Sequence, residues 1–325
     1  MLAQMGIAII ACLSYNILLG QGGMLSFGHA VYTGLGSFVA IHALNAITAG
    51  TSSIPVSLLP LVGGFAGIGF AVLLGYVTTK KSGTPFAMIT LGVAELVFAM
   101  SLMFSEFFGG EAGISGNRVA GQTVWGITFG PQIQVYYLIA IYTFICVALM
   151  YAFTQTPLGR ILNAVRDNPE RVEFIGYNTQ RVRYFAFIIA GFFAGISGGL
   201  GALNFEIVTS EVVGAGRSGG YLLFTFLGGA TFFFGPIIGG ILMVLAFVLL
   251  SKNKEHDWSI NFSHISKAPY GTYALTLLLP GNLKSQNNTN SYKTIYELKD
   301  SIQSDENILI ISSRFAPDQE DAKVL

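Results

Sequence analysis

Long apolar runs dominate the sequence and restrict it to one broad class of fold. Crossing the hydrocarbon core of a bilayer takes roughly 20 apolar residues in a helix. We expect a transmembrane helix in each of six runs: 2–20, 24–48, 55–79, 84–104, 134–154 and 184–203. Two shorter runs, 218–234 and 236–250, are separated at Gly235-Pro236 and are expected to be short or re-entrant helices. The sequence therefore predicts an all-α polytopic membrane protein with about 8 transmembrane or re-entrant helices.

Charge is scarce and unevenly distributed. Hydrophobic residues make up 52% of the chain and charged residues 10%, whereas average proteins carry about 25% charged residues. Residues 1–79 contain no charged side chain, and half of the 17 basic and 17 acidic residues follow Ser251. We therefore expect a transmembrane domain at 1–251 and a polar tail at 252–325. The body has no basic face of the kind that binds nucleic acid.

The basic residues of the short loops predict the orientation. Lys80 and Lys81 follow the third run, and five arginines lie between the fifth and sixth runs, at 156–183. Two spans separate these loops, so both are expected on one side, which the positive-inside rule makes cytoplasmic. The loops 105–133 and 204–217 are then expected on the outer side, with the N-terminus.

The polar segment 156–183 shows local signals of helix boundaries. Thr156-Pro157 and Asn168-Pro169 each place a capping residue before a proline, which favours helix starts. Gly176 fits a helix end, which predicts a short helix at about 169–175 with Val172 and Ile175 on one side. A helix of two turns is marginal alone. We therefore expect it to rest on the membrane face or on a partner protein, with a solvated surface loop as the alternative.

A few polar groups fall inside or between the apolar runs. The glycine-rich stretch 20–30 is interpreted either as a tight turn, with His29 satisfied by a neighbouring helix, or as a break beside a substrate path. Glu95 is the one acid inside a confident span, and it is expected either to line a path or to make a structural polar contact. The candidates for a translocation path are Gln21, Ser26, His29, Thr90 and Glu95, with Asn16 and Asn204 as weaker ones.

Three ordered stretches resemble one family. SYNILLGQGGMLSFGHAVYTGLGSF at 14–38, PLGRILNAVRDNPERVEFIGYNTQRVRYFAFIIAGFFAGISGGL at 157–200 and FLGGATFFFGPIIGG at 226–240 are similar to the membrane subunits of branched-chain amino-acid ABC importers, of the LivM type. The resemblance implies a permease that carries leucine, isoleucine or valine across the bacterial inner membrane and is not an enzyme. The implied partners are a second, homologous permease, two cytoplasmic ATPase subunits and a periplasmic binding protein.

The resemblance also assigns a role to the polar segment. Residues 157–176 would sit in a groove of an ATPase subunit, which would itself hold ATP and Mg, so no cofactor is expected in this chain. The sequence has no G-x-x-x-x-G-K-[ST] motif, which agrees with ATP binding in the partner subunits rather than in this chain. The residues expected to couple ATP hydrolysis to transport are Arg160, Arg166, Asp167, Asn168, Pro169, Glu170, Arg171 and Gly176.

Other functions are compatible with parts of the sequence. Related permeases carry urea or other amino acids, and an ion-coupled secondary transporter or channel would also account for Glu95 and the broken spans. An intramembrane enzyme would need a nucleophile with a base or a metal cluster, and His29 and His42 have no second type of ligand at a useful spacing. The sequence departs from the family after about Ser251, where Tyr270–Pro280 resembles only a shortened last span.

Overall fold

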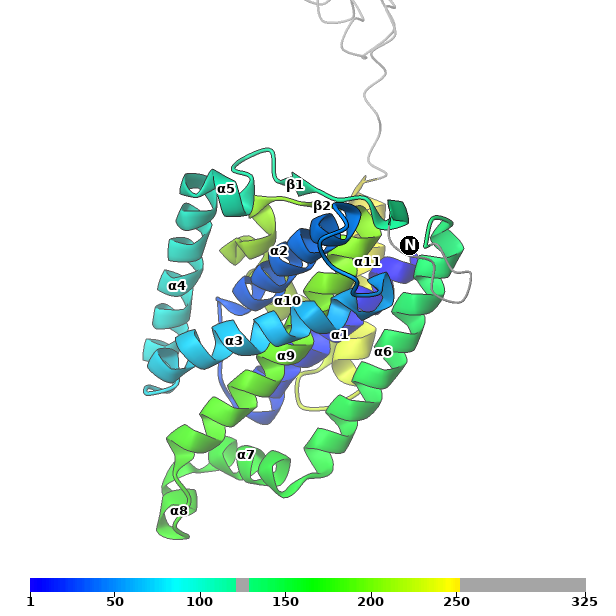
Figure 1. Ribbon diagram of the computed structural model, residues 1–325. Helices are drawn as coiled ribbons and strands as arrows, with labels where there is room; N and C mark the ends of the chain where they lie inside the picture. Colours follow the sequence, from blue (N-terminus) through cyan, green and yellow to red (C-terminus); the bar gives the residue numbers. More distant parts are fainter. Residues whose placement is uncertain (121–128, 252–325) are drawn as a thin grey trace, which may run out of the picture. The chain divides into compact units, whose positions relative to one another are not determined.

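The computed structural model describes residues 1–120 and 129–251 (Figure 1). The predicted tail at 252–325 therefore lies outside the described residues. The long helices are α1 (Leu2–Asn16), which continues as a π-helical turn η1 (Ile17–Gln21), α2 (His29–Thr48), α3 (Leu59–Thr78), α4 (Thr84–Met103), α6 (Gln132–Gln155) and α9 (Thr179–Phe205). The shorter helices are α5 (Ser105–Phe108), α7 (Pro157–Asp167), α8 (Pro169–Phe174), α10 (Ala215–Gly228) and α11 (Gly235–Ser251). The remaining elements are the strands β1 (Ile114–Ser115) and β2 (Ile207–Val208) and 3₁₀ turns at Val56–Leu58, Arg118–Ala120 and Ser210–Val213.

Six helical segments of the described chain are long and apolar enough to cross a membrane, which confirms the six predicted spans. Three boundaries differ clearly from the prediction, one of them the start of α9, which is Thr179 rather than 184. The second helix begins at His29 rather than at 24, because Gly22, Gly23 and Gly28 break the helix and residues 22–28 take an irregular path. The run 218–234 is helical only to Gly228, and residues 229–234 form the turn into α11.

The core is built by close packing of α9 against α2 and α3. Glycines make this approach possible, since a methyl group on Gly195 would overlap the carbonyl oxygen of Gly63, and one on Gly67 would overlap that of Gly191. Small residues at such spacings let helix backbones meet in lipid, where dispersion contacts replace the hydrophobic effect as the driving force. These glycines therefore serve close packing of α9 on α3.

Helices α4 and α6 flank this core and leave much of their surface uncovered (Figure 1). Met103 on α4 and Phe144 on α6 are each 77% exposed in the single chain. Apolar side chains on that scale suit contact with lipid or with another membrane subunit.

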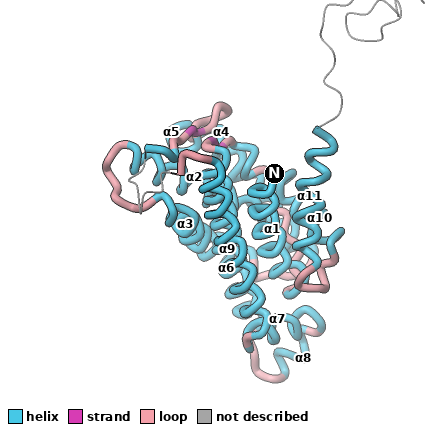
Figure 2. Tube along the Cα trace, turned by 90° about the vertical axis from the view of Figure 1, so that its right-hand side faces the viewer, coloured by secondary structure: helices cyan, strands magenta, loops and turns pink. Residues whose placement is uncertain are grey.

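The two ends of the transmembrane unit differ (Figure 2). At one end β1 pairs antiparallel with β2, and Asn45 near the end of α2 donates a hydrogen bond to Ser115 O. At the other end lie α7 and α8, and near them Tyr184 at the start of α9 packs on Tyr76, whose ring is covered by Lys80. The two basic loops therefore share one end, as predicted.

One outer-loop prediction was wrong in part. The stretch 204–217 does not remain a surface loop, because Val213 packs against Gly34 of α2 and Ser218 hydrogen-bonds to Ala30 at the first turn of that helix. Residues 210–218 thus follow α2 towards its N-terminal half, and Arg217 is part of α10 rather than of a loop.

Candidate coupling and translocation sites

The predicted helix caps of the cytoplasmic segment are confirmed. Thr156 Oγ1 accepts a hydrogen bond from Gly159 N at 3.2 Å, and Asn168 Oδ1 accepts one from Arg171 N at 3.1 Å. Pro157 and Pro169 follow these caps as the first helical residues, where a missing N–H has no cost. Gly176 has φ of +97° and ends the segment, a backbone conformation that glycine adopts without strain.

Helix α7 is amphipathic and lies against the membrane domain. Its buried positions, Gly159, Leu162 and Val165, recur at three-residue spacing and face α6 and α9. Arg160 lies on its exposed side. The helix is therefore fixed to the body of the protein through one apolar stripe.

Helix α8 carries exposed apolar side chains at its tip. Val172 is buried, whereas Phe174 is 89% and Ile175 is 74% exposed. The predicted helix 169–175 ends one residue earlier, at Phe174, and of the two residues expected on one side of it, Val172 and Ile175, the described chain covers only Val172. Two large apolar side chains next to Arg171 and Glu170 form a small exposed surface, which we call the α8 tip.

The predicted coupling residues fall into two groups. Arg160, Glu170 and Arg171 are exposed and free to meet a partner, whereas Asn168, Pro169 and Gly176 shape the backbone. Arg166 and Asp167 differ from both groups. They form an ion pair with Nη2 and Oδ1 2.9 Å apart, and Arg166 Nη1 also donates to Gly20 O of the π-helical turn.

His29 occupies the centre of a buried polar cluster within the membrane domain. Its side chain is fully buried, and its Nε2 lies 2.9 Å from Ser14 Oγ on α1. The rings of Tyr15 and Tyr221 meet it edge to face. Its Nδ1 has no hydrogen-bond partner among the described residues. The expectation that a neighbouring helix satisfies His29 is thus met at one of its two nitrogens.

Two helices hold the irregular segment 22–28 around this cluster, and a third holds the first turn of α2 beside it. Tyr15 of α1 donates to Ser26 O at 2.9 Å, and Thr90 of α4 accepts from Phe27 N at 3.2 Å. Ser218 of α10 accepts from Ala30 N at 2.8 Å. The structure therefore brings three of the predicted path residues, Ser26, His29 and Thr90, into one neighbourhood.

Sequence reasoning missed most of the partners in this cluster. Ser14, Tyr15, Ser218 and Tyr221 were not proposed as site residues. A signal existed in α10, where the buried polar residues Ser218, Tyr221 and Thr225 recur at three- and four-residue spacing within an apolar helix.

The remaining predicted path residues lie elsewhere. Gln21 is buried in the π-helical turn and makes no hydrogen bond to this cluster in the described chain. Glu95 lies on an exposed face of α4. Of the weaker candidates, Asn16 has a buried Oδ1 without a partner among the described residues, and Asn204 lies at the opposite end.

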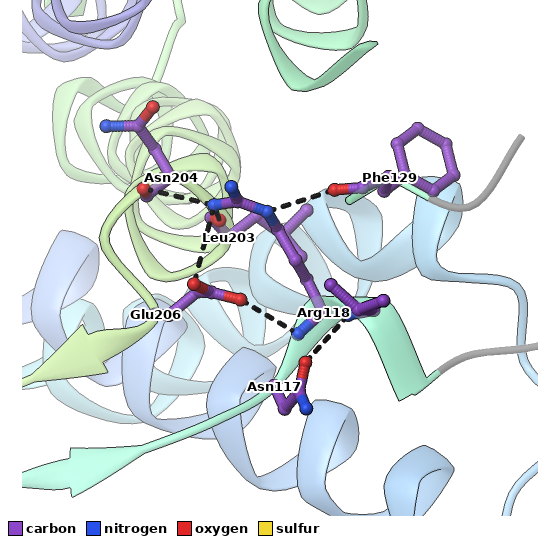
Figure 3. A network of polar contacts seen from close by, with 7 residues as sticks. Asn117, Arg118, Phe129, Leu203, Asn204 and Glu206 are labelled. Carbon is purple, nitrogen blue, oxygen red and sulfur yellow. Dashed lines mark hydrogen bonds and ion pairs between the residues drawn. The ribbon is translucent and has the colours of Figure 1, made fainter. Parts of the chain in front are cut away.

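A second polar network fastens the outer end, where Arg118 is 9% exposed (Figure 3). Its Nε donates to Phe129 O at 3.0 Å, and its Nη1 donates to Leu203 O at 3.1 Å and to Asn204 O at 3.4 Å. Glu206 accepts from the Arg118 backbone N at 3.0 Å and approaches the guanidinium to 3.7 Å. This arginine ties the outer loop to the end of α9, and the sequence reasoning gave it no role.

No group of three or more His, Cys, Asp or Glu side chains that could hold a metal ion occurs within residues 1–120 and 129–251.

Comparison with known proteins identifies the family. The family described as "Branched-chain amino acid transport system / permease component" matches residues 1–266. The chain belongs to this family. It is therefore a multi-pass membrane protein of a transport permease class, as the sequence resemblance implied, and not itself a catalyst. No solved structure matches the chain.

Several curated proteins are similar over most of the chain. The high-affinity branched-chain amino acid transport system permease protein LivM of Escherichia coli (strain K12) is 26% identical, covering 77% of this chain and 63% of its own length. The fructose import permease protein FrcC of Rhizobium meliloti is 25% identical, with 68% and 64% covered. The chain thus spans a little under two thirds of the length of these relatives. BraD of Pseudomonas aeruginosa, another branched-chain amino acid permease, is 23% identical, with 74% and 80% covered.

Proposed function

We propose that this chain is the membrane-spanning subunit of an ATP-driven ABC importer and that it works with two ATPase subunits bound at its cytoplasmic end. The α8 tip is the observation that carries this proposal. Phe174 and Ile175 are exposed beside Arg171 and Glu170 at the end that bears the basic loops. Apolar residues framed by charges on a capped, protruding helix suit insertion into a groove of a partner protein.

Substitutions at the α8 tip test the ATPase contact. Phe174→Glu places a charge in the proposed interface without disturbing the fold, because Phe174 packs on almost nothing among the described residues. We expect loss of ATPase co-purification and of ATP-dependent uptake, with unchanged amounts of the protein in the membrane. Glu170→Lys, which reverses a charge at the same tip, is expected to weaken binding less.

A control substitution at the same end of the protein separates the α8 tip from its surroundings. Arg181→Glu is the matched one, because Arg181 is exposed at the same cytoplasmic end but lies at the start of α9, outside the α8 tip. Normal ATPase binding by Phe174→Glu would contradict docking at the tip.

We propose further that Glu95 lines a translocation path shared with a second, homologous permease, and that a periplasmic binding protein delivers the solute to that path. An ionised carboxylate facing lipid in the middle of a span is costly. The chain leaves this face of α4 uncovered, so a partner subunit or a water-filled path accounts best for the acid. Glu95→Gln should reduce uptake while leaving ATPase binding unchanged, and normal uptake would contradict this role.

The substrates that we propose are branched-chain amino acids, after the family description and the LivM and BraD relatives. The fructose permease among the relatives favours a sugar as the second candidate. Uptake of radiolabelled leucine by the reconstituted importer should be inhibited by unlabelled isoleucine and valine, and not by glutamate, urea or fructose. Inhibition by fructose instead would move the assignment to sugars.

A further inference from the structure

Arg166 of α7 reaches into the membrane domain. Its Nη1 donates a hydrogen bond to Gly20 O, in the π-helical turn that ends the first span. Carbonyl groups in the last turn of a helix lack N–H partners, and a guanidinium there satisfies one of them and suits the negative end of the helix dipole. Arg166 thus connects the cytoplasmic segment to a transmembrane helix 146 residues earlier in the chain.

The aliphatic part of the Arg166 side chain is also confined by a neighbouring glycine. Gly23 has φ of +63°, and a methyl group on it would lie 2.8 Å from Arg166 Cγ. Beside it, a methyl group on Gly22 would lie 3.3 Å from a methyl carbon of Leu162 on the same face of α7. Helix α7 therefore lies in close contact with the glycines at the start of the irregular segment.

The far end of the irregular segment belongs to the buried polar cluster. Phe27 N is held by Thr90 of α4, Gly28 packs on the Thr90 carbonyl, and His29 begins α2. A continuous series of contacts thus runs from α7 through Arg166 to Gly20 and Gly23, along residues 22–28, and on to α4 and α2. Contacts of this kind can carry coupling when they connect elements with more than one arrangement.

We propose that Arg166 is a positioning residue that transmits displacement of α7 to the irregular segment 22–28. This rests on the proposed function, in which ATPase subunits move the cytoplasmic segment. It revises the expected role of Arg166, because its guanidinium is engaged by Gly20 O and Asp167 within the chain. Arg166 therefore acts after docking, in passing the motion on, whereas the α8 tip makes the contact with the ATPase.

Labelling of the irregular segment tests this transmission without knowledge of the solute. Leu25 is 36% exposed within the segment, whereas the native Cys12 and Cys146 are buried. A Leu25→Cys variant of the chain, assembled with its ATPase subunits, is treated with a maleimide with and without ATP and vanadate. We expect nucleotide to change the labelling rate at position 25 by roughly fivefold or more, the lower end of coupling between linked sites.

Arg166→Met removes the donors and keeps an unbranched stem. In the Leu25→Cys background it should abolish the nucleotide response while the ATPase subunits still co-purify. Arg166→Lys, which restores one donor and the charge, should recover part of the response. Arg181→Met is the matched control, because this arginine is exposed at the same end and its side chain has no partner among the described contacts.

The outcomes separate the two proposals. A nucleotide response that persists in Arg166→Met, or that is absent when Arg166 is intact, overturns the transmission role. Loss of ATPase co-purification in Arg166→Met alone shows that Arg166 serves docking instead. Failure of the unmodified chain to bind the ATPase subunits at all overturns the proposed function itself, and with it the inference.

Discussion

The two ends of this membrane domain use arginine in opposite ways. At the outer end Arg118 is almost fully buried, and its guanidinium donates to three backbone carbonyl oxygens next to Glu206. At the cytoplasmic end the Arg166 side chain is 33% exposed and bonds to one carbonyl oxygen and to Asp167, whose side chain is 66% exposed. The first arrangement fixes a loop, whereas the second is a single connection that water and a partner can reach.

The difference extends to the apolar side chains. The outer loop is held down through Phe108, which is buried against Phe38, while the α8 tip leaves Phe174 and Ile175 uncovered. A segment with few buried contacts is the kind that opens or moves at low cost. The outer loop is therefore fixed by buried side chains, whereas the surface at which a partner is proposed to bind is left exposed.

The largest expected effect is from removing the outer arginine. Arg118→Ala leaves three carbonyl groups without their donor and removes the positive charge near Glu206. We expect a loss of about 3 kcal/mol in stability, because a buried acceptor left without a donor costs about 1–3 kcal/mol, measured as thermal unfolding of the detergent-solubilised protein. Arg160→Ala, at an exposed position on α7, should change stability by less than about 0.5 kcal/mol. Equal losses of stability from Arg118→Ala and Arg160→Ala would show that arginines at the two ends do not differ in what they contribute to stability.

A milder change separates charge from hydrogen bonding in the same network. Glu206→Gln keeps an oxygen that accepts from the Arg118 backbone N but removes the negative charge near the guanidinium. We expect a loss of about 1.5 kcal/mol, the lower range for hydrogen bonds to charged groups. An effect as large as that of Arg118→Ala would show that the ion pair, and not the carbonyl groups, dominates the network.

A smaller effect is expected at the cytoplasmic end. Asn168→Ala removes the side-chain cap of α8, which typically costs about 1 kcal/mol. Because α8 is held by few other contacts, the loss should appear as faster amide exchange in residues 169–174, with the unfolding of the long helices unchanged. Unchanged exchange there would show that the cap does not stabilise α8, and destabilisation of the long helices would mean that α8 is integral to the core.

The smallest effect is expected at the α8 tip. Phe174→Ser should alter stability by less than about 0.5 kcal/mol, because a side chain that is 89% exposed contributes little to packing. Thermal unfolding of the isolated chain measures this, and Val172→Ser, on the same helix but buried, provides the contrast with a clear loss. A large loss from Phe174→Ser would show that the tip is covered within the chain.

Much of the fold could be predicted from local patterns. The six spans follow from the length of apolar runs, and both caps of the cytoplasmic segment follow from Thr156-Pro157 and Asn168-Pro169, since these features depend on neighbours in sequence. The contact between Thr90 and Phe27 spans 63 residues, and no local pattern indicates which helix faces which. The sequence therefore identified Ser26, His29 and Thr90 one by one but could not show that they meet.

The sequence by itself determined a polytopic helical membrane protein, the position of both basic loops at one end, and the ends of the short helices α7 and α8. The length of the apolar runs and the charge of the loops act through lipid and water. The capping residues act on the nearest turn of backbone, so none of these features needs a distant part of the chain. Only the tertiary structure decided that Arg118 is a buried anchor and that Arg166 joins α7 to Gly20. Those roles depend on which unpaired carbonyl oxygens lie within reach of a long side chain, and that is settled only when distant helices pack.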